Sequence, residues 1–273
     1  MIRVRYNQTA VRAYNSLNTT MSEISKSSRQ LSSGERINQA ADDPARLSMA
    51  TTFETLSTSL QRALKNTNDG LSIVQTAENA TREVVNIMTR VRELAVQSGS
   101  ETMADSERGY VNEEFLQLRE EIERIAQETN FDGIPLTNGE TASLLAQVDV
   151  RNTAESRVEI VLGDLRVNTL GVDAIDLSSV DGARSAIDIT DGVINQLSQY
   201  RSDFGAAQNQ LDEALSSTVT RLEALSKAEN QIMDLDYAKA TTNAARLQII
   251  QQAGVAAVSQ ARNISQGALE LLS

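Results

Sequence analysis

The side chains with the clearest potential for chemistry are clustered carboxylates. Glu120, Glu121 and Glu123 lie close together, next to Arg119 and Arg124. Neighbouring carboxylates act as general acids and bases in enzymes and bind hard cations. Because arginines flank this cluster within a segment of helical periodicity, we interpret it as a solvated helix face with local ion pairs.

Two aspartate pairs also have cation-binding residue types. Asp42 adjoins Asp43, which precedes Pro44, and Asp234 lies near Asp236. An aspartate followed by proline is typical of a helix start, with the carboxylate as the N-cap. We therefore expect both pairs to cap helices and form salt bridges rather than to bind a metal ion.

Glycines give no nucleotide signature. Asn68-Asp69-Gly70 is a turn sequence in isolation, but it lies inside a helical pattern. We therefore interpret Gly70 as a residue whose small size allows a neighbouring element to pack closely. No glycine-rich phosphate loop is predicted, because the later glycines are isolated: Gly163, Gly171 and Gly182.

The composition removes most enzyme classes. The 273 residues include no His, Cys or Trp, and 25 Lys and Arg stand against 37 Asp and Glu, a net charge of −12. Without imidazole or thiolate there is no Ser-His-Asp triad, no His-based zinc site and no disulfide framework. An acidic chain is unsuited to nucleic acid or anionic lipid. We predict no catalytic, cofactor or metal site, and neither a nucleic-acid nor a membrane partner.

The elements behind these residues are long helices. Hydrophobic residues make up 40% of the chain but aromatic residues only 3%, which suits helices packed side by side through aliphatic side chains. No apolar run is long enough to span a membrane, and the first twenty residues lack the apolar core of a cleaved secretory signal.

Both chain ends carry apolar residues in alternating steps of three and four, the pattern of a heptad seam. The first seam ends before Gly34, a plausible C-cap. Its members are Ala10, Tyr14, Leu17, Met21, Ile24, Ser28 and Leu31. The last seam is rich in small residues and comprises Leu247, Ile250, Gly254, Ala257, Ala261, Ile264, Ala268 and Leu271.

Three further helices and a β region are predicted between these ends. The helices run from Pro44 to about Gln97, from about Ser106 to Glu128, and from near Gly182 through Ile232. Residues 130–139 form a loop. Strands are expected over 144–149 and 157–162, with 165–170 returning as a partner strand after a turn at Gly163. The fold is therefore mainly α: a long antiparallel helical bundle or coiled-coil rod with a small β-hairpin element. A generic antiparallel coiled coil fits the periodicity equally well.

Specific strings narrow this choice, because five blocks in order resemble bacterial flagellins. The three N-terminal blocks are Leu31–Asn38 with Ala40–Asp43, Asn66–Glu78 and Arg90–Gln97. The two C-terminal blocks are Arg201–Asn209 and Ile249–Gly254. The ending, Asn263–Leu272, also resembles the C-terminus of this family. The resemblance implies a structural filament subunit, not an enzyme. It also implies export by the flagellar type III apparatus without a cleaved signal, and an extracellular place in the flagellum.

The resemblance also implies a domain layout and partners. Residues 1–43 with 230–273 would form the inner filament domain, and 44–229 a rod domain with its β element at about 140–172. There is no room for a variable outer domain, so the chain looks like a short flagellin. The expected partners are further copies of the chain, other flagellins, an export chaperone on the C-terminal helix, and the cap and hook-junction proteins.

Two departures from the family pattern leave rival functions open. The opening Met1–Tyr6 is unusually basic and is similar to that of hook–filament junction proteins, and Ser265 stands where many flagellins have Pro. A junction protein, or another secreted coiled-coil adhesin or tip protein, is therefore the alternative.

The family's Toll-like receptor epitope corresponds to Arg90, Leu94 and Glu114, although Thr89 replaces a common Gln. Arg90 and Leu94 are four apart, so they are expected to share a helix face.

Overall fold

The computed structural model describes the backbone of residues 8–270 and the side chains of residues 8–263. It divides into two compact units. The terminal unit comprises Met1–Thr55 with Ala224–Ser273, as far as these are described, and the central unit comprises Leu56–Glu223. The predicted domain boundaries at 43/44 and 229/230 stay a prediction.

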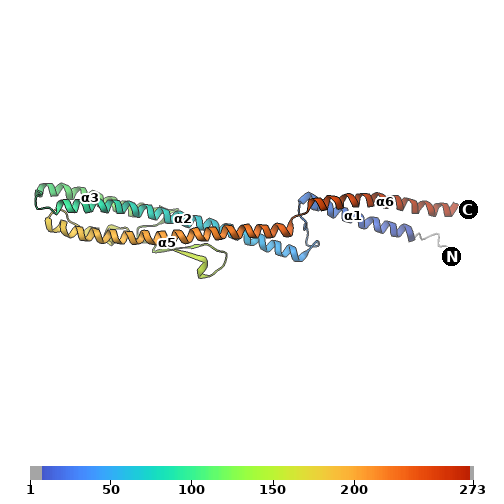
Figure 1. Cartoon of the computed structure of the whole chain (residues 1–273), viewed down its shortest axis with the longest axis horizontal. Helices are drawn as coiled ribbons and strands as arrows, with labels where there is room; N and C mark the ends of the chain where they lie inside the picture. The colour runs from blue at the N-terminus through green and yellow to red at the C-terminus, as the bar shows by residue number, and fades with distance from the viewer. Residues whose placement is uncertain (1–7, 271–273) are drawn as a thin grey trace. The chain divides into compact units, whose positions relative to one another are not determined.

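The terminal unit is built on α1 (Gln8–Ser33) and α6 (Tyr237–Glu270), which lie side by side in Figure 1. They are antiparallel, since Gly34 adjoins Tyr237 at one end and Gly254 adjoins Leu17 further along. Gly34 follows the end of α1 with a φ of 77°, so the predicted glycine C-cap is confirmed.

A short connection ties the ends of helices together in the terminal unit. Arg36 donates its backbone N–H to Met233 O at 2.7 Å, and Leu235 N donates to Gly34 O at 3.0 Å. The Arg36 guanidinium also donates to the carbonyl of Ile232. Arg36 therefore satisfies carbonyls at the C-terminal end of α5 (Val180–Met233), which a helix leaves unpaired.

The start of α2 (Pro44–Ser98) agrees with its prediction. Asp43 Oδ1 accepts the backbone N–H of Arg46 at 3.0 Å, as an N-cap does. The helix continues without a break through Gly70. A Cβ on Gly70 would lie 3.3 Å from the Cβ of Ala146, so the glycine does permit close packing.

In the central unit α2 and α5 pack with α3 (Asp105–Glu128), as Figure 1 shows. Phe115 and Ile122 of α3 are fully buried among aliphatic residues of α2 and α5. A second cluster lies where α2 and α5 meet the β region and includes Val74, Ile160 and Phe204. Burial of these side chains drives the folding of the unit.

The strands predicted over 144–149 and 157–162 are present in shorter form, and they pair with each other, which the sequence did not indicate. β3 (Ser143–Gln147) pairs antiparallel with β4 (Arg157–Val161), Leu145 opposite Glu159. Val158 and Ile160 are buried while Arg157, Glu159 and Val161 are exposed, the alternation of a half-buried strand. The region expected to be a loop contains a minimal hairpin of β1 (Asn130–Phe131) and β2 (Ile134–Pro135).

The prediction of a returning strand at 165–170 is wrong. The segment forms a single helical turn, α4 (Val167–Leu170), closed by Gly171 at a φ of 74° and followed by the 3₁₀ turn η2 (Val172–Ala174). The carboxylate of Asp164 accepts the backbone N–H of Arg166 at 3.1 Å and the hydroxyl of Thr169 at 2.7 Å. Such local capping outweighs the alternation of apolar residues in the segment.

Candidate assembly and recognition surfaces

The seam of α1 packs with a different phase from the one predicted. Leu17, Ile24 and Leu31 are partly buried, but Tyr14 and Met21 are exposed by 56% and 45%. The side chains that alternate with the leucines on the packed side are instead Ala13, Thr20 and Ser27. Small side chains thus take the places that were predicted for Tyr14 and Met21, and these two large residues remain on the surface.

The seam of α6 shows the same shift. Leu247 and Ala261 are buried and Gly254 is partly buried, while Ile250 and Ala257 are exposed. The alternate packed positions are Ala244, Gln251 and Val258. Of the remaining predicted seam residues, Ile264 and Ala268 lie beyond the described side chains and Leu271 lies outside the described residues.

The outer side of α6 is also apolar. Ile249 and Val255 are exposed by 67% and 51%. Exposed alanines accompany them at Ala245, Ala253, Ala256 and Ala257. Polar residues such as Gln248 and Gln252 lie between them, and apolar side chains gathered on an exposed helix mark a candidate interaction surface. The monomer therefore leaves on its surface a helix whose composition suits the interior of an assembly.

The receptor candidates lie on the central unit and differ in accessibility. Arg90 Nη2 and Nε contact Glu114 Oε1 at 2.8 and 3.0 Å, joining α2 to α3. Both side chains are about half exposed. The hydrogen bonds to Glu114, then to Glu93, raise the pKa of Arg90 above its ordinary value. Leu94, in contrast, is 1% exposed and belongs to the core.

A buried arginine positions this pair of helices. Arg108 is 4% exposed and donates to Ser98 O at 2.7 Å, Ser100 O at 2.9 Å and Met103 O at 2.8 Å. It thereby fixes the turn between α2 and α3. Sequence reasoning missed this residue, because nothing in its neighbourhood distinguishes it from the exposed arginines of the same helix.

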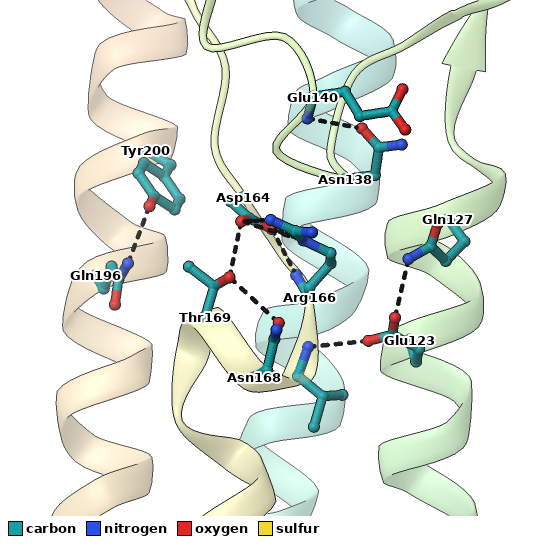
Figure 2. Close-up of polar contacts among 11 residues, drawn as sticks. Glu123, Gln127, Asn138, Glu140, Asp164, Arg166, Asn168, Thr169, Gln196 and Tyr200 are labelled. Carbon is teal, nitrogen blue, oxygen red and sulfur yellow. Dashed lines mark hydrogen bonds and ion pairs between the residues drawn. The ribbon is translucent and has the colours of Figure 1, made fainter.

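Figure 2 shows how the segment around α4 is fastened to α3. Glu123 Oε2 accepts the backbone N–H of Val167 at 3.0 Å. Arg166 Nη2 contacts Asp164 Oδ2 at 2.7 Å, and this interaction holds the pKa of the Asp164 carboxyl below its ordinary value. Glu121 instead pairs with Arg124 on the helix surface. Glu121 thus forms a local ion pair, as predicted, whereas the contact from Glu123 to the backbone of α4 was not indicated by the sequence.

The aspartate pairs are caps and salt bridges as well. Asp42 contacts Lys26 at 2.8 Å, and Asp236 accepts the backbone N–H of Lys239 at 3.1 Å. The described residues contain no group of carboxylates that could hold a metal ion. None of the described helices is long and apolar enough to cross a membrane.

The sequence did not indicate one further feature, a cleft of about 740 Å³ in the terminal unit. Ser27 and Gln30 of α1 line it together with Lys239 and Arg246 of α6. Arg36 also lines it, and its buried Nε has no hydrogen-bond acceptor among the described residues. The cleft marks one face of the α1–α6 pair.

Comparisons with known proteins give a consistent result along the chain. The profile of the bacterial flagellin N-terminal helical region matches residues 4–142, and that of the C-terminal helical region matches residues 187–272. A flagellin of Halalkalibacterium halodurans is 35% identical over 98% of this chain and 99% of its own length. A flagellar filament core protein of Brachyspira hyodysenteriae is 32% identical over the same shares of the two chains.

Solved structures show a similar fold. A crystal structure of Bacillus cereus flagellin matches with a TM-score of 0.50 and 26% identity, covering 56% of this chain and 88% of its own. A putative flagellar hook-associated protein from Vibrio parahaemolyticus matches with a TM-score of 0.60, covering 71% of this chain and all of its own, at 13% identity.

Proposed function

The chain belongs to the bacterial flagellin family, and on that premise we propose which of its surfaces build the filament. It is a structural subunit that polymerises into the extracellular flagellar filament for motility. Since the family consists of structural proteins, we further propose that it has no enzymatic activity.

The proposed assembly surfaces are the exposed apolar residues of α1 and α6. The observation that carries this proposal is that α6 exposes large apolar side chains in addition to those that it packs against α1, with Ile249 and Ile250 both exposed. Stacking further copies against these helices removes that surface from water, which is favourable at roughly 25 cal/mol per Å² of apolar area. Contacts that do not close a ring produce an open filament.

Polymerisation from purified monomer tests this proposal. Seeds or a precipitating salt are added, and negative-stain electron microscopy is expected to show long uniform filaments. Deletion of residues 257–273 removes most of the C-terminal half of α6 and is expected to abolish polymerisation. Filaments formed by the truncated chain would refute the role of the terminal helices.

The same exposed surface requires protection before assembly. We propose that an export chaperone covers the C-terminal helix in the cytoplasm, that the flagellar type III apparatus exports the chain, and that the cap protein receives it at the tip. The 257–273 deletion is expected to abolish chaperone binding too, measured by co-purification with the chaperone. Binding that persists would place the chaperone elsewhere.

We also propose that the flagellin-sensing Toll-like receptor recognises the monomer through Arg90 and Glu114. Their half-exposed ion pair presents a guanidinium and a carboxylate across α2 and α3. Leu94 is buried, so its proposed role changes from a direct anchor to packing that holds the helix surface in place.

A matched pair of variants tests the receptor surface. Arg90→Ala is expected to weaken receptor binding at least about tenfold, the range of an interface hot spot. Arg92→Ala is the control, because Arg92 lies on the same helix but pairs with Asp191 of α5 at 2.6 Å, whereas Arg90 pairs with α3. Equal affinities of the two variants, measured by surface plasmon resonance, would remove the proposal.

The alternative function is that of a hook–filament junction protein, or of a secreted adhesin or tip protein. The hook-associated neighbour shows that this fold also occurs in that class, and at 13% identity it shows no more than the fold. Solution behaviour separates the two, since a junction protein stays monomeric under conditions in which a filament subunit polymerises.

A further inference from the structure

The two exposed apolar stripes of the terminal unit lie on opposite faces of the α1–α6 pair. Successive residues of an α-helix are about 100° apart. Ile24 is on the packed side of α1; Met21 lies about 60° from it in one direction and Ser27 about 60° in the other. Ser27 lines the cleft, so Met21, with Tyr14 one heptad before it, flanks the opposite face.

The stripe on α6 belongs to the cleft side. Lys239 and Arg246 line the cleft, and Ile250 and Ala257 follow Arg246 in helical steps of four and seven. These four side chains therefore point to one side of α6. Val255 is five residues, or about 140°, from Ile250 and so lies on the other side, with Tyr14 and Met21.

We name the two surfaces by these residues. The cleft face comprises Ser27 of α1 with Lys239, Arg246, Ile250 and Ala257 of α6. The tyrosine face comprises Tyr14 and Met21 of α1 with Val255 of α6. The side chains that form them are exposed in the monomer apart from the buried Ser27.

We infer that the tyrosine face of one copy packs on the cleft face of the next copy. The inference rests on the proposed assembly role of the terminal helices and specifies the partner surface. Two unlike faces on opposite sides of one body, each with an exposed apolar stripe, make a head-to-tail contact, which repeats without closing, whereas a single self-complementary face would stop at a dimer. The large Tyr14 and Met21 side chains then meet the Ile250 and Ala257 stripe, where alanine leaves room for them.

Cysteine mapping tests this pairing directly, because the natural chain contains no cysteine. Filaments are grown from Met21→Cys, Ile250→Cys and the double variant, and from the corresponding Tyr14→Cys and Ala257→Cys set, and are then oxidised. A disulfide needs Cα atoms about 4.4–6.8 Å apart. The expected result is a ladder of cross-linked subunits from at least one double variant, and no cross-links from any single variant.

Two results would overturn the inference. Dimers from a single-cysteine filament would show that a face meets its own copy. Well-formed filaments in which no double variant cross-links would show that the two faces do not meet. Failure of the wild-type chain to polymerise is a separate result, which contradicts the proposed function and not the pairing.

Seeded growth gives a second test that does not depend on cross-linking. Met21→Glu spoils only the tyrosine face and Ile250→Glu only the cleft face; Ser22→Glu, at an exposed polar position of α1, is the control. Far-UV circular dichroism checks that all three monomers are folded. In mixtures with wild-type seeds and monomer, one face variant is expected to add to a filament end and block further addition, so that the filaments become several-fold shorter. The other face variant and the control are expected to leave the filament length unchanged. Equal effects of the two face variants would contradict two distinct faces.

Discussion

The central unit and the terminal unit bury very different amounts of apolar side chain. In the central unit Phe115, Ile122 and Phe204 are fully enclosed by other residues of the same chain. On the described part of α6 only Leu247 and Ala261 are buried hydrophobic residues, while Ile249 and Val255 face solvent. The contrast indicates that the central unit can be stable in the monomer. Under the proposed assembly, the terminal unit gains its remaining burial from neighbouring copies.

The largest expected difference comes from truncating one buried side chain in each unit. Phe115→Ala is expected to lower the free energy of unfolding of the central unit by roughly 3–5 kcal/mol, through lost burial and a cavity. Leu247→Ala should leave that transition unchanged and reduce helicity of the terminal unit. Urea unfolding followed by circular dichroism, with hydrogen exchange of α6 amides, measures both. Equal shifts of the main transition would mean that the two units unfold together.

Two arginines that satisfy backbone carbonyls provide the next comparison. Arg108→Met removes three hydrogen bonds to backbone carbonyls of the central unit, one of them fully buried, and is expected to cost about 3 kcal/mol. Arg36→Met removes the guanidinium contact to Ile232 O in the terminal unit but retains the backbone contact to Met233 O. Its effect on the main unfolding transition is expected to be under about 1 kcal/mol. Reversal of this order would contradict the assignment of stability to the central unit.

Low pH is expected to weaken both units through carboxylates with lowered pKa values. Arg166 lowers the pKa of Asp164 in the central unit, and Lys26 lowers that of Asp42 in the terminal unit. A carboxyl whose folded pKa is depressed contributes stability above its unfolded pKa of about 3.9, and that contribution is lost as the pH falls through the folded value.

Asp164→Asn isolates the central part of this effect. At neutral pH it is expected to lower the unfolding free energy by about 1–2 kcal/mol, because the charge-assisted hydrogen bonds from Arg166 are weakened. Below about pH 4 its stability should fall less steeply than that of the wild type. Thermal unfolding at a series of pH values tests this, and parallel pH curves for the two proteins would contradict it.

The smallest expected effect concerns glycines inside the helices of the central unit. A Cβ on Gly205 of α5 would meet no described atom within 4 Å, whereas one on Gly70 would lie 3.3 Å from Ala146. Gly205→Ala is expected to stabilise the unit by about 0.5–1 kcal/mol, since alanine loses less entropy in a helix. Gly70→Ala should gain less or destabilise. Melting temperatures that rise equally would mean that the β hairpin moves aside easily.

Much of this architecture was predictable from local signals. The heptad spacing predicted the long helices, and Asp43 before Pro44 predicted the start of α2. The phase of the seams was not predictable, because steps of three and four fit two neighbouring faces, and tertiary packing selects between them; on α1 it selected the face with the smaller residues. Leu94 shows the same limit: its separation from Arg90 predicts a shared side of the helix, but only the packing of α3 and α5 places it inside. The turn at α4 depends on Glu123, which is 44 residues from Val167.

Arg108 has a consequence that concerns the surroundings of the cell. It is the only charged residue among the buried side chains of the described chain. The other buried polar groups are hydroxyls and one amide, which do not titrate in water near neutrality. The buried side chains of the described residues therefore include no carboxyl, amine, phenol, imidazole or thiol that could exchange a proton as the cell moves from mildly acidic to alkaline water. The packing of these side chains inside the filament subunit is in this respect independent of the pH of the surrounding water.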